Sequence, residues 1–112
     1  YASSPPFEVV DGIATTGALL ETCFRQVEYA GVLNGAANPD GAKKLVDFLV
    51  SAEVQAQIPN SMYMYPADDT VPLPPDWVDF APLAPEPFQV LPADIEANRD
   101  EWISQWTAIV VG

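Results

Sequence analysis

The first seven residues combine groups suited to holding a small polar ligand. They join the ring of Tyr1 to the hydroxyls of Ser3 and Ser4 and to a proline pair. Ser4 followed by Pro5 is typical of a helix start, with the serine as N-cap and the proline in the first turn. Backbone N–H groups at such a start are free to bind anions. The segment therefore predicts an anion-binding turn next to an aromatic ring.

Residues 60–66 form a second unusual segment, in which methionine and tyrosine alternate ahead of a proline. The alternation predicts a short extended run with Tyr63 and Tyr65 on one face and Met62 and Met64 on the other. An edge strand with one half-buried face explains the same pattern. The pattern alone is therefore compatible with two roles for this segment, a ligand-binding face and an edge strand with a half-buried face.

Enzymatic chemistry finds little support in the residue types. The chain contains no histidine, which excludes imidazole acid–base catalysis and histidine metal ligands. No nucleophile motif and no glycine-rich phosphate loop is present. Among the acidic residues only Asp68 and Asp69 form a tight pair, and two solvated loop charges explain it. We expect a protein that is not an enzyme and that carries no cofactor or metal.

Composition limits the chain to one domain or part of one. It has 112 residues, of which 49% are hydrophobic, and a formal net charge of −12. This charge disfavours nucleic acid and anionic membrane surfaces as partners. The chain begins at Tyr1, so we expect a mature product or an excised piece. The single Cys23 is either a small buried residue or half of a disulfide whose partner lies outside this sequence.

Two helices are expected in the middle of the chain. Asn38 is a good N-cap, Pro39 suits the first helical position, and apolar residues follow at helical spacing. Ser51 caps a second short helix that ends near Gln57.

Residues 24–33 predict a strand, because they are rich in aromatic and branched residues and are followed by an Asn-Gly turn. Asp11 and Gly12 predict an earlier turn.

The second half of the chain divides into a proline-rich strap and a helix. Residues 66–92 contain eight of the twelve prolines, which makes regular structure improbable, and the interleaved aromatic residues predict that the strap docks on a surface. Pro92 then begins a terminal helix. Ile95, Trp102 and Ile109 repeat every seven residues on one stripe, which predicts packing against another layer. A ligand platform on this stripe is the alternative.

Several stretches together resemble a known family. They are residues 23–33, 42–51, 58–59, 64–66 and 98–106. In order and with few gaps, they resemble the C-terminal third of the thiamine-binding solute-binding proteins of ABC importers. The resemblance covers nearly the whole chain. It implies an α/β fold class, as an incomplete part of a two-lobed type II periplasmic-binding-protein fold, helix-rich with few strands.

The resemblance also implies the site residues. The opening segment of the family, which runs from one tyrosine through hydroxyl residues and proline to a second tyrosine, lies at the cleft between the lobes. Tyr1, Ala2, Ser3 and Ser4 match it, and Phe7 stands in place of the second tyrosine. The aromatic residue before Met-Tyr-Pro, often tryptophan in the family, is here Tyr63. These six residues are the expected ligand-binding set.

Function and organisation follow from the same resemblance. It implies an extracytoplasmic or periplasmic, non-enzymatic protein that captures thiamine or its phosphates by aromatic stacking and hydrogen bonds and delivers them to an ABC permease. Residues 1–22 would be the cleft segment, residues 23–58 a strand with helices, residues 59–91 the crossover strap and residues 92–112 the terminal helix.

Two other functions stay open at this stage. One is a ferric-ion-binding protein of the same superfamily, for which Tyr1, Tyr63 and Tyr65 provide phenolic oxygens. The other is a small acidic interaction module. If two thirds of the family's length is absent, the Leu45 face and the Trp102 stripe lose their neighbours. We then expect these faces to dock on each other, or to be covered by a missing N-terminal portion or a second copy of the chain.

Overall fold

The computed structural model describes all 112 residues, and most of its regular structure is helical. Its elements, in chain order, are η1 (Pro5–Glu8), β1 (Val9–Val10), β2 (Ile13–Ala14), η2 (Leu20–Thr22), α1 (Pro39–Leu49), α2 (Ala52–Gln55), α3 (Ile58–Met62), α4 (Pro75–Phe80) and α5 (Pro92–Val110). One two-stranded antiparallel sheet, β1–β2, accompanies these helices. The expected helix-rich α/β composition with few strands is confirmed.

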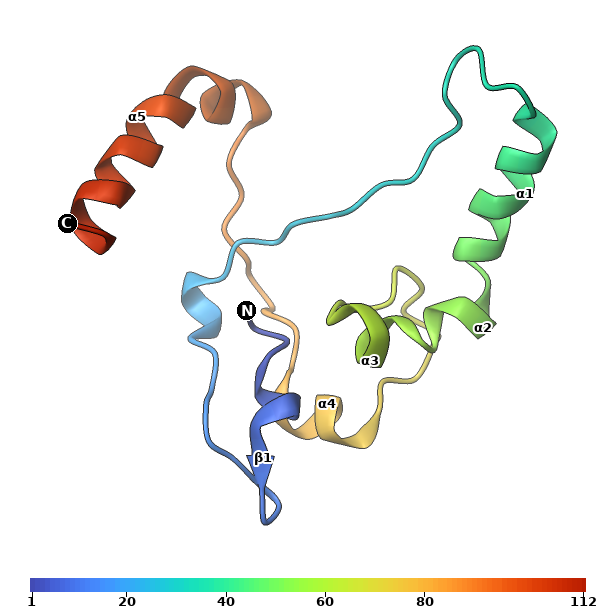
Figure 1. Ribbon diagram of the computed structural model, residues 1–112. Helices are drawn as coiled ribbons and strands as arrows, with labels where there is room; N and C mark the ends of the chain where they lie inside the picture. Colours follow the sequence, from blue (N-terminus) through green and yellow to red (C-terminus); the bar gives the residue numbers. More distant parts are fainter.

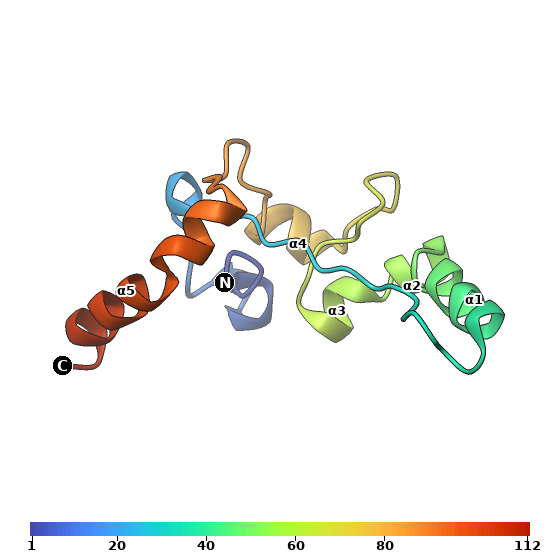
Figure 2. The ribbon, with the colours of Figure 1, turned by 90° about the horizontal axis from the view of Figure 1, so that it is seen from above.

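The chain has a small body and two projecting arms. In Figure 1 the body holds η1, β1 and α4, while α5 extends to one side and α1 to the other. Figure 2 shows the same arms at opposite ends of the molecule. The Cα radius of gyration is 17.7 Å, whereas a compact domain of this length has about 13 Å. The arms account for this open shape.

The core is correspondingly small. Eight of the 112 residues are buried, and Trp77, at 1% exposure, is the largest of them. Pro59, Ala81, Ala84 and Val71 bury apolar groups as well. Helix α4 packs on η1, so the core joins the opening segment to the proline-rich strap. The expected docking of the strap is therefore found at Trp77.

The opening segment folds into a tight hairpin. Strands β1 and β2 pair in the register Val9↔Ala14 and Val10↔Ile13. The predicted turn between them is confirmed, since both Asp11 (φ 52°) and Gly12 (φ 79°) adopt the left-handed conformation that a two-residue hairpin turn needs. The helix start after Ser4 is confirmed in place, although the element is a 3₁₀ turn and Ser4 makes no side-chain capping bond.

Capping residues set the starts of the middle helices. The Asn38 Oδ1 accepts a hydrogen bond of 2.9 Å from the Gly41 N–H at the start of α1. The Ser51 hydroxyl accepts one of 3.5 Å from the Val54 N–H at the start of α2. Both predicted caps are confirmed. The second helix ends at Gln55, slightly earlier than predicted.

A buried amide ties this arm to the strap. Gln55 is only 6% exposed. Its Nε2 donates to the Leu49 carbonyl at 2.7 Å, and its Oε1 accepts from the Ala67 N–H at 2.6 Å. One side chain thus provides hydrogen-bond partners for a backbone carbonyl at the end of α1 and for a backbone N–H at the beginning of the strap. Sequence reasoning gave Gln55 no role.

The predicted strand over residues 24–33 is wrong. The segment is extended, but its only ladder contact is an isolated parallel bridge between Phe24 and Phe88, with the Phe88 N–H donating to the Cys23 carbonyl at 2.8 Å. Residues 25–32 make no backbone hydrogen bond. Strand propensity gives an extended chain, whereas a strand also needs a neighbour, and none is present here. Cys23 itself is free and only partly buried.

Two predictions around the prolines are also wrong. Residues 60–62 belong to helix α3 instead of an extended run, because Pro59 occupies its first turn, where a missing N–H costs nothing. The strap contains helix α4, which begins at Pro75 and has Asp76 in its first turn. In both places proline starts a helix.

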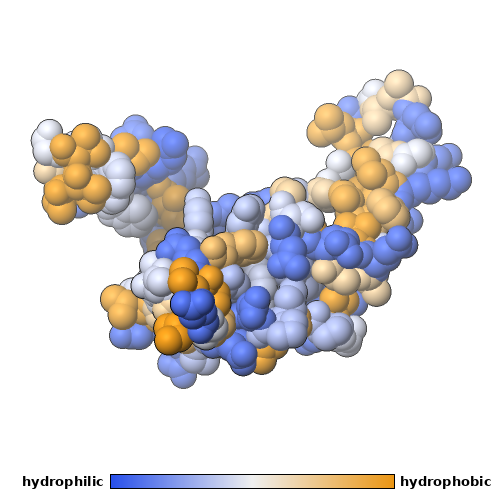
Figure 3. Space-filling view, turned by 60° about the horizontal axis from the view of Figure 1, so that its bottom comes forward, coloured by the Kyte–Doolittle hydropathy of each residue, from blue (hydrophilic) through white to orange (hydrophobic).

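The two arms do not pack on each other. Helix α5 begins at Pro92 as predicted, but its stripe is exposed, with Trp106 at 58%. Leu45 and Phe48 on α1 are exposed as well. In Figure 3 apolar surface is visible on both arms. Mutual docking of these faces and burial of the tryptophan stripe were therefore wrong expectations, while coverage by another chain stays a prediction.

Candidate ligand-binding site

The structure places two of the predicted site residues in contact. Phe7 lies in η1, and Tyr63 directly follows α3. Their ring centroids are 4.4 Å apart and their planes are tilted by 52°. Phe7 is 43% exposed and Tyr63 is 56% exposed. The pair therefore presents aromatic surface to solvent, drawn from two segments far apart in the sequence.

Two further aromatic residues support this pair from inside the body. Trp77 meets Phe7 edge-on, with centroids 6.0 Å apart and planes at 89°. It meets Tyr65 in the same way at 5.2 Å and 88°. The four rings form one continuous series, Tyr63–Phe7–Trp77–Tyr65, which we call the aromatic row. Sequence reasoning did not place Trp77 in the site, and its position within a proline-rich strap gave no spacing signal.

The opening turn contributes less polar surface than expected. The Ser4 N–H donates to the Tyr1 carbonyl at 3.0 Å, which closes a turn over the first four residues. This turn leaves Ser3 only 5% exposed and Ser4 partly exposed, while the Tyr1 side chain is fully exposed. Ala2 is partly exposed. The structure thus brings Phe7 and Tyr63 together, while Tyr1 points into solvent.

Tyr63 adopts an unusual backbone conformation. Its φ of 57° and ψ of 32° are left-handed, and its N–H donates to the Pro59 carbonyl at 3.1 Å. This geometry ends α3 in the way that glycine usually does. A non-glycine residue there costs about 1–2 kcal/mol. In this conformation the Tyr63 ring contacts Phe7, a feature that the sequence pattern did not reveal.

Tyr65 fastens the row to the end of α4. Its hydroxyl donates to the Ala81 carbonyl at 3.1 Å. Burial raises the pKa of Tyr65 above its ordinary value, and the negative charge of Cys23 in its thiolate form raises it further. The neutral, donating form of the hydroxyl is therefore favoured in the folded chain.

Tyr65→Phe tests this bond. At pH 7 we expect the free energy of unfolding to fall by about 1 kcal/mol, because the Ala81 carbonyl loses its donor. A raised folded-state pKa stabilises the fold below the ordinary tyrosine pKa of about 10 and loses that effect as the pH rises through the folded value. Urea unfolding between pH 9 and 11 should therefore show a steeper alkaline decline in wild type than in Tyr65→Phe. Equal slopes would contradict the assignment, and Tyr29→Phe, at an exposed tyrosine, is the control.

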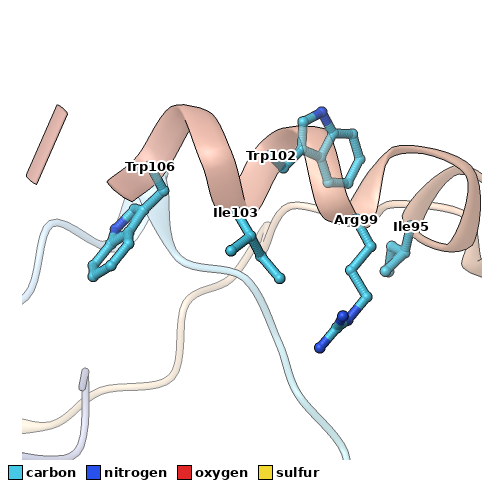
Figure 4. A pocket seen from close by; sticks show the side chains of 5 residues that line it. All are labelled: Ile95, Arg99, Trp102, Ile103 and Trp106. Atoms are coloured by element: carbon cyan, nitrogen blue, oxygen red, sulfur yellow. The ribbon is translucent and has the colours of Figure 1, made fainter. Parts of the chain in front are cut away.

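Two shallow grooves lie away from the aromatic row. One, of about 320 Å³, is formed along α5 by Ile95, Arg99, Trp102, Ile103 and Trp106. All five lining residues belong to this helix, and Figure 4 shows their side chains leaving it. The other, of about 370 Å³, lies between β2 and the end of α4. Neither includes a predicted site residue. No group of three or more metal-binding side chains gathers in the structure.

Known proteins from three bacteria that match this chain carry the same name. A thiamine-binding periplasmic protein of Salmonella typhimurium is 31% identical over 113 residues, which cover 98% of this chain and 34% of that protein. Its counterpart in Escherichia coli is 30% identical with the same coverage. That of Brucella abortus is 31% identical over 96% of this chain and 33% of its own length. The chain is similar to the thiamine-binding periplasmic proteins.

The expected resemblance to thiamine-binding proteins is therefore confirmed, along nearly all of this sequence. The chain spans about a third of the length of the curated relatives it matches. No family model and no solved structure matches it. These relatives are named for thiamine, which leaves the ferric-ion alternative without support among them. No helix of the chain has the length and apolar character required to cross a membrane.

Proposed function

We propose that this chain is part of the ligand-binding component of an ABC importer for thiamine or its phosphates, and that it acts outside the cytoplasm. Similarity to thiamine-binding periplasmic proteins over 98% of the chain carries this proposal. The same relatives motivate a periplasmic location and a binding role without catalysis. Because the chain spans only a third of their length, transport by the whole protein is itself part of the proposal.

The exposed Phe7–Tyr63 pair suits the chemistry of thiamine. The thiazolium ring is a permanent cation, and an aromatic face attracts a cation by about 0.5–2 kcal/mol, depending on how well water is excluded. The flat pyrimidine ring adds stacking against a second aromatic face. Two tilted rings 4.4 Å apart offer both kinds of surface side by side. The net charge of −12 agrees in sign with a cationic ligand.

We assign the remaining contacts to partners that the chain does not contain. In a two-lobed type II fold, a second wall facing Phe7 and Tyr63 would close over the ligand and exclude water, which strengthens the cation–π contact. The apolar faces of α1 and α5 would pack in such a larger assembly. An ABC permease would then receive the ligand from the closed protein.

Calorimetric titration of thiamine into the product of the complete gene tests the proposal. We expect saturable one-site binding with a Kd of about 1 µM or tighter. Thiochrome, a neutral oxidised form of thiamine, should bind about tenfold more weakly, because it lacks the permanent charge. Absence of binding at millimolar thiamine would refute the proposal. A visible phenolate-to-iron absorption band on adding Fe(III) would favour the ferric-ion alternative instead.

A further inference from the structure

Trp77 occupies a position that packing alone explains poorly. It is 1% exposed, yet its indole Nε1 has no hydrogen-bond partner in the chain. An unpaired buried N–H is unfavourable, because it gives up its hydrogen bonds to water. Phenylalanine would fill much of the same space without this cost. Space filling therefore does not explain the tryptophan, whereas the contacts of its wider indole do.

The indole reaches two rings that a smaller side chain would not span. It meets Phe7 edge-on on one side and Tyr65 edge-on on the other, with interplanar angles of 89° and 88°. Edge-to-face contacts are directional, because the positive ring edge faces the negative ring face. Tyr65 is in turn held by its hydrogen bond to the Ala81 carbonyl, at the end of the helix that carries Trp77.

Phe7 therefore packs against the buried Trp77 on one side, while its other ring partner, Tyr63, remains exposed. Trp77 has no ring contact with Tyr63, so the ring-to-ring path between them runs through Phe7. We propose that Trp77 is a positioning residue: its buried indole sets the orientation of Phe7 and thereby the aromatic surface that Phe7 and Tyr63 offer to a ligand. The ligand part of this inference rests on the proposed function.

The first measurement needs no ligand. The four tyrosines are labelled with 3-fluorotyrosine, and their ¹⁹F resonances are assigned with single Tyr→Phe variants. We expect Trp77→Phe to shift the Tyr63 resonance, although the two side chains share no ring contact, and to leave exposed Tyr29 unchanged. Val71→Ala, which removes buried methyl groups elsewhere in the core, is the matched control. An unmoved Tyr63 resonance, or an equal shift in Val71→Ala, would overturn the inference.

The second measurement is a double-mutant cycle with thiamine as the probe. In the product of the complete gene we expect Trp77→Phe to weaken binding by about tenfold, because misplaced stacking surface binds less well. In a Phe7→Leu background the same change should weaken binding by less than about twofold, since its effect passes through Phe7. Fully additive losses would overturn the positioning role.

The two measurements separate this inference from the proposed function. If Trp77→Phe shifts the Tyr63 resonance but the unmodified protein does not bind thiamine, the ring positioning stands and the proposed ligand is wrong. If the unmodified protein binds thiamine and Trp77→Phe binds equally well, the proposed function stands and the positioning role is wrong.

Discussion

Gln55→Leu is expected to lower the free energy of unfolding by about 2 kcal/mol. The leucine fills a similar volume but leaves the Leu49 carbonyl and the Ala67 N–H without their partners. A backbone group deprived of its hydrogen bond costs about 1–3 kcal/mol when water cannot replace the partner. Leu49 and Ala67 are themselves exposed to solvent, so water partly replaces the lost partners and the sum stays near the lower end. Urea unfolding followed by circular dichroism measures the change.

Gln57→Leu is the matched control, because Gln57 is exposed two residues further along and makes no side-chain hydrogen bond. We expect a change within about 0.5 kcal/mol there. If both variants destabilise the chain equally, the two bonds of Gln55 have no special weight. The strap would then be held to α1 and α2 by apolar contacts alone.

Tyr63→Gly is expected to weaken thiamine binding by about tenfold or more while leaving stability nearly unchanged. Loss of the ring removes the cation–π and stacking surface proposed for the ligand. On stability, loss of the Phe7 contact costs about 0.5–1.5 kcal/mol, and relief of the left-handed backbone returns about 1–2 kcal/mol. The two contributions nearly cancel. Calorimetry with thiamine and urea unfolding measure them separately.

Tyr63→Trp provides the converse variant, because tryptophan presents the strongest cation–π face. It should bind thiamine at least as well as the wild type. Retained affinity in Tyr63→Gly would show that the ring does not touch the ligand. A large loss of stability in the same variant would show that Tyr63 acts as a packing residue.

Local signals in the sequence explain what could be predicted of the fold. Asn38, Ser51 and Pro92 each determine a helix start through their own side chain or ring, so the starts of α1, α2 and α5 follow from neighbouring residues alone. The turn at Asp11–Gly12 is similarly local. These features need no knowledge of distant segments.

Predictions failed where the outcome depends on distant partners. Residues 24–33 have strand-forming side chains, but pairing depends on a second strand that this chain does not supply. The contact between Phe7 and Tyr63 joins segments on either side of α1, and spacing cannot reveal it. The family resemblance implied that both residues bind the ligand. Their contact, and the packing of Trp77 against Phe7, are seen only in the structure.

The unpaired extended segment has a consequence for how the chain behaves in solution. Residues 25–32 leave their backbone N–H and C=O groups open along both edges, and Val27, Tyr29 and Val32 favour cross-strand association. Arg25 and Glu28 cancel each other's charge within the segment, so protection against self-association comes from the net charge of −12 on the whole chain. Salt screens that repulsion over about 8–10 Å at physiological concentrations. We therefore expect the 112-residue chain on its own to stay dispersed at low ionic strength and to assemble into β-rich aggregates as salt is added, which light scattering and circular dichroism would measure.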